Sequence, residues 1–470
     1  MEAINNKLSE FKIKISGKKI AVLGIGVSNI PAIKYLVSLG AKVTAHDKKV
    51  LSSDKIEELK KIGVEFVFGD NYLNNLNNYE YILRSPGIKP FLPELENLSK
   101  DIIVTSEIEL LLELCPCKVI GVTGSDGKTT TTTLVSKFLE EAGYKVWLGG
   151  NIGIPLFSKL DEISMKDIVV VELSSFQLMS SKVPIDTAII TNISPNHLDY
   201  HRSFKEYIDA KANIFKYGKN NKVVLNLDNS YTTNYLQIMK ENELYPEIRY
   251  FSVVENVFNG VFLKNGYIVS NVNKKEDVVA NISEVKLVGI HNIANICAAA
   301  SAVIDITGTA PIKKVITTFT GVEHRMEFVV EKSKVSWYND SIGTSPARTI
   351  AGLKAFSKKI ILIAGGYDKN IPYDELGIYI LEKVKVLILM GKTAKKIEEA
   401  VLKAKNENSD LNCDIEIIHM NNLEESVNCA KLKAIEGDIV VMSPASASFD
   451  LYKNFEERGD HFKKLVLEQD

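Results

Sequence analysis

The chain has 470 residues, which is too long for one hydrophobic core, so about two to four domains are expected. Charged residues make up 25% and hydrophobic residues 45%, the usual proportions of a globular protein, and the formal net charge is -2. This balance argues against a general binder of nucleic acids or of membrane surfaces, so we expect neither as a partner.

The chain shows no targeting or membrane-spanning signal and no disulfide pattern. Residues 1–19 are polar, and no apolar run approaches the length of a membrane span. The five cysteines are an odd number scattered along the chain. Cys115-Pro116-Cys117 has the spacing of half a metal site, but no second pair or nearby histidine completes it. We therefore expect reduced thiols and a cytoplasmic location.

The first predicted elements form a βαβ unit. A strand at Lys19–Leu23 leads through a glycine turn into a helix at about 31–39, and a second strand follows at Lys42–Asp47. The dinucleotide fingerprint requires a third glycine where Asn29 stands, so NAD binding is not favoured. Asp47 is a candidate to bind a ribose or a base, although a solvated strand end is the alternative. A strand at 81–83 runs into the turn 84–88, on the same rim.

Residues 119–130 read as a strand, a glycine turn and the start of a helix. Glycine allows the backbone to point successive N–H groups into one concavity, where a polyphosphate is stabilised by the helix N-terminus. A lysine and a threonine follow directly, as nucleotide binding requires, so an ordinary strand–helix turn is disfavoured. Val122 stands where the common loop has glycine, so this is a variant loop. The predicted ATP contacts are Gly124, Ser125, Asp126, Gly127, Lys128, Thr129 and Thr130.

Two later strands of this region end on groups that suit a magnesium nucleotide. The apolar strand 168–173 carries Glu172 at its end, and an acid there can hold Mg²⁺ or its waters. His197 follows the strand 188–193 and can ligate a metal or contact phosphate, whereas His201 and Asp199 are interpreted as structural. In the predicted helix Phe204–Lys216, Lys211 reads as a surface lysine from its pattern alone.

A third α/β region begins near residue 320. Predicted strands at 335–338, 360–364, 385–390 and Ile439–Met442 are each followed by glycine or polar residues, so this region also binds a ligand along one rim. Gly391-Lys392-Thr393 lacks the upstream glycines of a phosphate loop and is interpreted as a turn. The predicted domains are 1–106, 107–320 and 321–470.

Together these motifs resemble the Mur ligase family, the ATP-dependent ligases that build the peptide stem of bacterial peptidoglycan. The resemblance spans nearly the whole chain and implies a three-domain α/β fold. The N-terminal and C-terminal domains would be Rossmann-like, and the central P-loop domain would have a mostly parallel sheet. The matching stretches are 121–130, Asn151-Ile152-Gly153, 172–175, 192–197, 289–295 and Glu323-His324-Arg325.

Within the family the chain most resembles members that add D-glutamate to UDP-N-acetylmuramoyl-L-alanine, on the Gly24 turn and the stretches 85–88, 106–109, 339–341 and 443–455. We expect a monomer. The resemblance implies nucleotide contacts from Asn295, Arg325 and Asp340. It implies contacts to the UDP substrate from Val27, Ser28, Asp47, Lys49, Ser85, Gly87 and Asn151.

The resemblance also implies two Mg²⁺ ions and a carbamylated lysine at Lys211, which replaces the surface reading given by the pattern. The metal ligands would be Thr129, Glu172, His197 and carbamylated Lys211. The catalytic set would be Lys128, Lys211, His197 and Glu172. Catalysis would proceed through an acyl phosphate, which the amine of the amino acid attacks to give a tetrahedral intermediate.

The chain departs from the family pattern at Asp126, where asparagine is commoner, and at Ile342, where a lysine is expected beside D-glutamate. Ser448 and Phe455 would line the amino-acid site. We hypothesise that Thr344 and Arg348, with the helix start after Ser345, replace the lysine. The alternative is that Arg348 is a solvated residue on a helix face.

Three alternatives remain from the sequence. Two are enzymes of the same class, namely another Mur ligase with a different amino acid and a ligase similar to folylpolyglutamate synthase. The third is a P-loop switch protein, which would hydrolyse ATP without an amino acid. The amino acid that supports ADP formation separates these functions.

Overall fold

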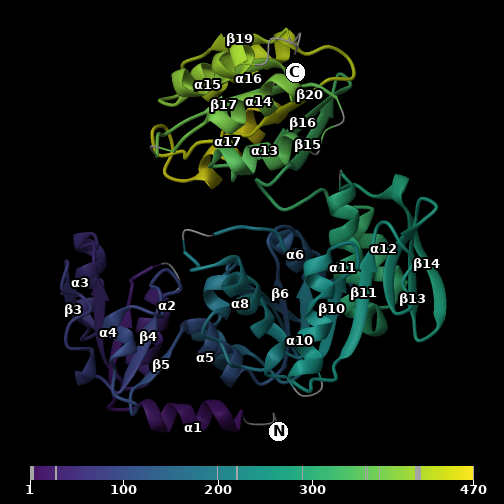
Figure 1. The fold of residues 1–470 in the computed structure, drawn as a ribbon. Helices are drawn as coiled ribbons and strands as arrows, with labels where there is room; N and C mark the ends of the chain where they lie inside the picture. The colour runs from purple at the N-terminus through teal and green to yellow at the C-terminus, as the bar shows by residue number, and fades with distance from the viewer. Residues whose placement is uncertain are drawn as a thin grey trace. The chain divides into compact units, whose positions relative to one another are not determined.

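The computed structural model describes residues 5–26, 29–197, 200–218, 221–287, 289–354, 356, 358–369, 371–407 and 414–468. Val27, Ser28, Asp199 and Cys413 lie outside these residues. The chain forms two compact units, one of residues 1–285 with 290–317 and one of residues 286–289 with 318–470. Two β-sheets belong to the first unit and one to the second (Figure 1), so the predicted three-domain α/β fold is confirmed.

The N-terminal sheet is five-stranded, parallel and Rossmann-like. The first and fourth strands are neighbours, at the point where the strand order reverses. The Gly24 turn and Ser85 follow these two strands, so they lie on one rim of the sheet. In spatial order the strands are β3 (Glu65–Phe68), β2 (Lys42–Asp47), β1 (Lys19–Leu23), β4 (Tyr81–Arg84) and β5 (Ile103–Thr105). The helices of this part are α1 (Asn6–Ile15), α2 (Asn29–Ser38), α3 (Ser53–Lys61) and α4 (Pro93–Glu96).

The helix α2 begins at Asn29, two residues earlier than the sequence predicts. Asn29 is buried, and its side-chain amide donates a hydrogen bond to the carbonyl of Gly24 at 2.6 Å. Asparagine thus closes the glycine turn with a side-chain bond at the position where the dinucleotide fingerprint has its third glycine.

The central sheet has nine strands, of which the first seven are parallel to one another, and its last two strand pairings are antiparallel. In spatial order they are β7 (Val146–Gly150), β8 (Ile168–Glu172), β6 (Lys118–Thr123), β9 (Thr187–Ile190), β10 (Lys222–Asn226), β11 (Glu247–Ser252), β12 (Gly260–Lys264), β13 (Tyr267–Val272) and β14 (Lys275–Asn281). The helices are α5 (Glu107–Leu114), α6 (Lys128–Glu141), α7 (Ser175–Leu178), α8 (Phe204–Lys216), α9 (Ser230–Thr233), α10 (Tyr235–Glu241), α11 (Ile290–Thr307) and α12 (Thr309–Ile316).

The helix α11 is long and apolar enough to cross a membrane by length and composition, contrary to the sequence expectation. Its apolar window has a mean hydropathy of 1.3, but 61% of that window is buried inside the protein. Buried alanines between Ile296 and Val303 let it pack closely on the central sheet. Its apolar character is therefore that of a core helix.

The C-terminal sheet has six strands and is parallel except for its first strand. In spatial order they are β15 (Glu327–Lys332), β16 (Val335–Asn339), β20 (Ile439–Met442), β17 (Ile360–Gly365), β18 (Val384–Met390) and β19 (Glu416–His419). A hydrophobic cluster packs on each face. The helices are α13 (Pro346–Leu353), α14 (Asp374–Lys383), α15 (Ala394–Glu407), α16 (Leu423–Lys433) and α17 (Phe455–Leu467).

A buried carboxyl group on α5 makes stability depend on pH. Glu107 accepts a hydrogen bond from the backbone N–H of Phe157 at 3.1 Å, and burial raises the pKa of its carboxyl from 4.5 to about 7. The native state therefore keeps a proton that the unfolded chain loses between these values. The free energy of unfolding should fall as pH rises through this window, by roughly 2–3 kcal/mol between pH 5 and pH 8.

Glu107→Gln should remove most of this fall, because the amide keeps the oxygen acceptor and carries no titrating proton. Urea unfolding of both proteins at pH 5 and pH 8 measures the difference. The same change at the exposed Glu113 of α5 is the matched control. A wild-type stability that is equal at the two pH values would contradict the prediction.

Candidate functional site

The glycine turn after β6 has the conformation of a phosphate loop. Gly124 (φ 149°) and Gly127 (φ 77°) adopt backbone angles that favour glycine. A side chain at Gly127 would come within 2.3 Å of the Asn295 side-chain oxygen, so Asn295 packs directly on the loop. The helix α6 begins at Lys128, two residues earlier than expected, so its N-terminus faces the concavity of the loop.

The loop is held by Thr191 and Asn192, to which sequence reasoning assigned no individual role. Ser125 N–H donates to the carbonyl of Asn192 at 2.8 Å, and Asp126 N–H donates to the Asn192 side chain at 3.0 Å. Thr191 Oγ1 donates to the carbonyl of Asp126 at 2.6 Å. The strand β9 therefore ends at Ile190 rather than at 193, because the residues after it turn to bind the loop.

Tyr207 is a further support of the loop that sequence reasoning interpreted only as a core position. Its hydroxyl lies 2.8 Å from Ser125 Oγ, and Ser125 Oγ also donates to the carbonyl of Ser194 at 3.0 Å. The signal in the sequence was only a tyrosine at a buried helical position, which does not reveal a partner 82 residues away.

Lys128, Thr129 and Glu172 lie together at the loop. The Lys128 ammonium donates to the carbonyls of Gly124 (2.9 Å) and Ser125 (2.8 Å). Thr129 Oγ1 donates to Glu172 Oε2 at 2.7 Å, and Glu172 is buried at the end of β8. The strand-end acid is therefore brought to the threonine, as the sequence predicts.

These two residues suit a magnesium ion. Their oxygens are the hard ligands that Mg²⁺ prefers. Their oxygens are 2.7 Å apart, close to the roughly 3.0 Å expected between adjacent ligands of an octahedral ion with bonds of about 2.1 Å. Asn151 donates its side-chain amide to the other oxygen of Glu172 at 2.8 Å, which fixes the carboxylate. Asn151 therefore contacts Glu172. The other residues predicted to contact the UDP substrate lie at the rim of the N-terminal sheet.

Lys211 is buried, with an exposed fraction of 1%, so the surface reading given by its pattern is wrong. Its amine donates to the carbonyl of Gly124 at 2.7 Å and lies 3.3 Å from Thr123 Oγ1. Burial lowers the pKa of Lys211 well below its usual value, and the charge of Lys128 acts in the same direction. Its amine is therefore held at the phosphate loop in an environment that favours the neutral form.

His197 follows β9 in a strained turn. Its φ is 55°, in the left-handed region that residues other than glycine rarely occupy, and such strain often accompanies a functional site. Its ring makes an edge contact with Phe176 of α7 at 5.0 Å. Nearby His201 is buried and lies 2.9 Å from Ser175 Oγ, consistent with the structural role interpreted from the sequence.

Apart from Asn151, the predicted UDP contacts that the structure describes gather around the Gly24 turn. Asp47 accepts hydrogen bonds from the N–H groups of Ile25 (2.7 Å) and Lys49 (2.8 Å), so its carboxylate orders this turn. Ser85 N–H donates to the carbonyl of Leu23 at 2.9 Å, which places the turn with Ser85 and Gly87 beside it.

In the C-terminal unit, Asp340 is buried directly after β16, at the rim where the parallel strands of the sheet end. Asp340 Oδ2 accepts a hydrogen bond from Ser443 Oγ at 2.6 Å, and Oδ1 accepts from Met326 N–H at 3.2 Å. Burial raises the pKa of Asp340 to about 6, while the positive charges of Arg325 and Arg348 oppose this rise. The predicted nucleotide contacts Arg325 and Asp340 are therefore neighbours.

The predicted amino-acid contacts lie on the same rim. Arg348, in the first turn of α13, is exposed and donates to the carbonyl of Ile342 at 3.3 Å. Ser345 precedes this helix, but its side chain makes no capping bond. Thr344 lies in the loop before it. Ser448 is buried after β20, and the Phe455 carbonyl at the start of α17 accepts from Ser341 Oγ at 2.7 Å.

Two cations of this rim were missed from the sequence. Burial lowers the pKa of Lys369, which follows β17, and the nearby charges of Arg348 and Arg458 lower it further. Arg458 is buried and donates to the Ser341 carbonyl (2.9 Å) and the Ala447 carbonyl (3.1 Å). It therefore ties the loops after β16 and β20 together. Lys369 follows a glycine turn at a parallel strand end, which was the available signal.

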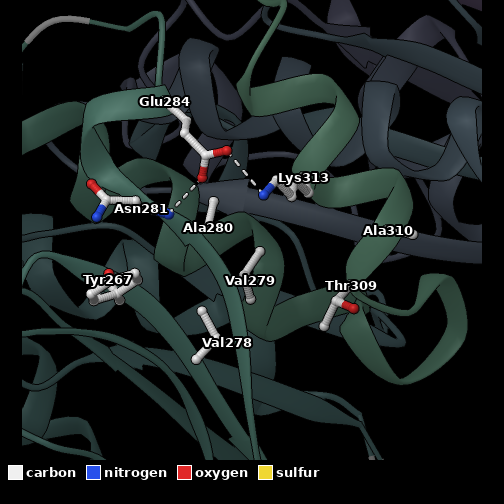
Figure 2. A pocket seen from close by; sticks show the side chains of 9 residues that line it. All are labelled: Tyr267, Val278, Val279, Ala280, Asn281, Glu284, Thr309, Ala310 and Lys313. Atoms are coloured by element: carbon white, nitrogen blue, oxygen red, sulfur yellow. Dashed lines mark hydrogen bonds and ion pairs between the residues drawn. The ribbon is translucent and has the colours of Figure 1, made fainter.

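A shallow depression of about 320 Å³ lies at the far edge of the central sheet, among β13, β14 and α12. Figure 2 shows Glu284 and Lys313 pointing toward one another there, with their charged atoms 3.0 Å apart. Since β6 lies five strands from β13 in the sheet, this depression is separate from the phosphate loop.

Comparisons with solved structures identify the fold. A UDP-N-acetylmuramate-alanine ligase from Thermotoga maritima matches with a TM-score of 0.56 at 17% identity, over 96% of this chain and 100% of that chain. MurF from Acinetobacter baumannii matches with a TM-score of 0.55 at 13% identity, over 97% of this chain and 92% of that chain.

Comparisons of sequence are closer. The UDP-N-acetylmuramoylalanine–D-glutamate ligase of Ruminiclostridium cellulolyticum is 51% identical, over 98% of this chain and 99% of that protein. Its namesake in Acetivibrio thermocellus is 49% identical with the same coverage. Family models match as follows: Mur ligase MurD-like N-terminal domain at 18–105, Mur ligase middle domain at 122–303, and Mur ligase glutamate ligase domain at 324–446. The resemblance predicted from the motifs is confirmed, and this chain belongs to the Mur ligase family.

Proposed function

We propose that this protein is the ATP-dependent ligase that joins D-glutamate to UDP-N-acetylmuramoyl-L-alanine in peptidoglycan precursor synthesis. The observation that carries this function is the identity of about half of all residues, along almost the full chain, with ligases named for this reaction. The phosphate loop with Lys128, Thr129 and Glu172 supplies the ATP site that the reaction needs.

The chemistry requires activation of a carboxylate, because a carboxylate is a poor acyl donor. The γ-phosphoryl group of ATP passes to the carboxylate of the L-alanyl residue, which gives an acyl phosphate and releases ADP. The amine of D-glutamate attacks its carbonyl carbon, and the tetrahedral intermediate collapses to an amide and phosphate. The chain positions the reactants, places cations against developing charge and excludes water.

Each predicted residue has a role in this proposal. Lys128 neutralises charge on the transferring phosphoryl group, and the loop N–H groups between Gly124 and Thr130 hold the phosphates. Bound Mg²⁺ would shield phosphate charge and would be held by Thr129, Glu172 and His197. Asn295 and Arg325 contact the nucleotide and Asp340 its ribose. The Gly24 and Ser85 turns hold the UDP group.

We also propose that Lys211 is carbamylated. A neutral lysine amine attacks the carbon of CO₂ and releases a proton, leaving an anionic carbamate. Burial favours the neutral amine that this step needs. An ammonium would repel a cation, whereas a carbamate oxygen suits a second Mg²⁺.

The function is tested by incubating the protein with ATP, Mg²⁺ and UDP-N-acetylmuramoyl-L-alanine and screening amino acids for phosphate release. We expect release with D-glutamate. Release with a diamino acid, or with L-alanine on UDP-N-acetylmuramate, would indicate another Mur ligase. Folate-dependent release with glutamate would indicate the folylpolyglutamate synthase-like activity. Release without any amino acid would indicate a P-loop switch protein. The domain limits 106/107 and 320/321, a monomeric state and a cytoplasmic location remain parts of the proposal.

The cationic rim of the C-terminal unit should decide D-glutamate affinity. D-Glutamate brings two carboxylates, and Arg348 and Lys369 are two of the cations on this rim, together with Arg325 and the buried Arg458. Arg348→Ala should raise the KM for D-glutamate about tenfold or more, the effect of losing a charge-assisted contact of ~1.5–3 kcal/mol. The KM for ATP should be unchanged.

Lys369→Ala should act in the same direction, and Lys354→Ala, at the other end of α13, is the matched control. Steady-state kinetics with D-glutamate varied at saturating ATP measures all three variants. If Lys369→Ala raises the KM and Arg348→Ala does not, Lys369 replaces the missing lysine and Arg348 is a solvated helix residue. Ser448 and the backbone at Phe455 would then provide the remaining contacts.

A further inference from the structure

The segment 200–202, which lies shortly after His197 in the chain, contacts residues 86–96 at the rim of the N-terminal sheet. Tyr200 Oη donates a hydrogen bond to the carbonyl of Pro86 at 2.8 Å. The guanidinium carbon of Arg202 lies 3.9 Å from the centre of the Phe91 ring, and its Nη2 lies 3.8 Å from Glu96. Three kinds of contact, a hydrogen bond, a cation–π contact and an ion pair, therefore join this segment to residues 86–96.

The same segment also contacts His197, the predicted metal ligand. The N–H groups of Tyr200 and His201 both donate to the carbonyl of His197, at 3.1 and 3.0 Å. The Phe176 ring packs against Tyr200 at 4.1 Å between ring centres and against His197 at 5.0 Å. Because the left-handed backbone of His197 is unfavourable by itself, these contacts help to hold His197 in place.

The buried side chain of Arg84 also holds the turn 85–88. Arg84 donates to the carbonyls of Ser85 and Ile88, and its Nη2 donates to Ser180 Oγ at 2.9 Å. Ser180 follows α7, the helix that carries Phe176. Among the described residues, Arg84 thus attaches the turn to Ser180, and Tyr200 attaches it to the stretch that continues to His197.

We propose that Tyr200 is a positioning residue that couples occupation of the turn 85–88 to the placement of His197. The inference rests on the proposed function, because it takes this turn as the UDP-substrate site and His197 as a ligand of the nucleotide's Mg²⁺. A uridine nucleotide that orders the turn fixes the Pro86 carbonyl. Tyr200 is then fixed through its hydroxyl, and His197 through the two backbone bonds.

Two ligands that order one shared element bind with positive and reciprocal cooperativity. UDP-N-acetylmuramoyl-L-alanine should therefore tighten the binding of Mg²⁺ with a non-hydrolysable ATP analogue, and the analogue should tighten the binding of the UDP substrate by the same factor. Productive loading of both substrates would be favoured over ATP bound alone, which limits wasteful hydrolysis.

Tyr200→Phe is the direct test, because it keeps the ring against Phe176 and removes only the hydroxyl. Calorimetry measures the Kd of the ATP analogue in the presence of Mg²⁺, with and without saturating UDP-N-acetylmuramoyl-L-alanine. The ratio of the two Kd values is the coupling. We expect the substitution to reduce this ratio about fivefold, the factor that one hydrogen bond contributes. The Kd of the analogue alone should stay within twofold of wild type.

Tyr81→Phe is the matched control. Tyr81 lies on β4, the strand that leads into the same turn, and its buried hydroxyl has no hydrogen-bond partner among the described residues. Its removal should leave the coupling unchanged. A role of Tyr200 in folding alone would lower the Tm and leave the ratio at the wild-type value, which overturns the inference. A wild-type ratio near one also overturns it, while D-glutamate-dependent phosphate release in the same protein leaves the proposed function intact.

Discussion

Lys128→Ala should give a folded protein that scarcely turns over. The lysine stabilises charge that develops as the phosphoryl group transfers, and the loss of one such group typically costs about 100- to 1,000-fold in kcat. Its ammonium donates to the carbonyls of Gly124 and Ser125, which are polar contacts within its own loop rather than core packing, so we expect a small effect on stability. D-Glutamate-dependent phosphate release and thermal melting together measure the effect.

Lys137→Ala, on the same helix α6, is the matched control for the removal of a lysine. We expect near wild-type kcat for this control and a Tm of the Lys128 variant within a few degrees of wild type. Near-normal turnover of Lys128→Ala would contradict the assignment of the loop as the site of phosphoryl transfer.

Lys211→Ala should be inactive and partly rescued by a short carboxylate. If the lysine works as a carbamate, its anion can be supplied in part by acetate or formate at high concentration. Activity should therefore fall about 100-fold or more and recover in acetate, but not in chloride at the same ionic strength. The measurement is phosphate release across a series of acetate concentrations.

The control is Lys205 on the same helix α8. Its side chain is exposed, and its ammonium pairs with Asp209 at 2.6 Å. Lys205→Ala should keep full activity with and without acetate. In the wild type, removal of CO₂ and bicarbonate should lower activity, and their return should restore it. A fully active Lys211→Ala would show that the lysine is only part of the core.

The sequence by itself determined the parts of this protein that depend on local pattern. Alternating apolar strands and glycine turns predict the three α/β sheets, and the spacing from Gly124 to Thr129 predicts a phosphate loop because few other residues allow that backbone. The end of an apolar strand likewise predicts Glu172 at the rim. These inferences need no knowledge of distant partners, and the structure brings Thr129 and Glu172 within 2.7 Å.

Only the tertiary structure decided which polar residues face the site and which are buried. Lys211 has the local pattern of a surface lysine, yet packing of α8 beneath the loop buries it and lowers its pKa. Lys369, which follows β17, lies near Arg348 of α13 and Arg458 of α17, although these residues are far apart in the sequence. Tyr200 reaches Pro86 across 114 residues of sequence. Helical and strand periodicity report which face of one element is apolar, but contacts between elements depend on sheet order, which local pattern does not encode.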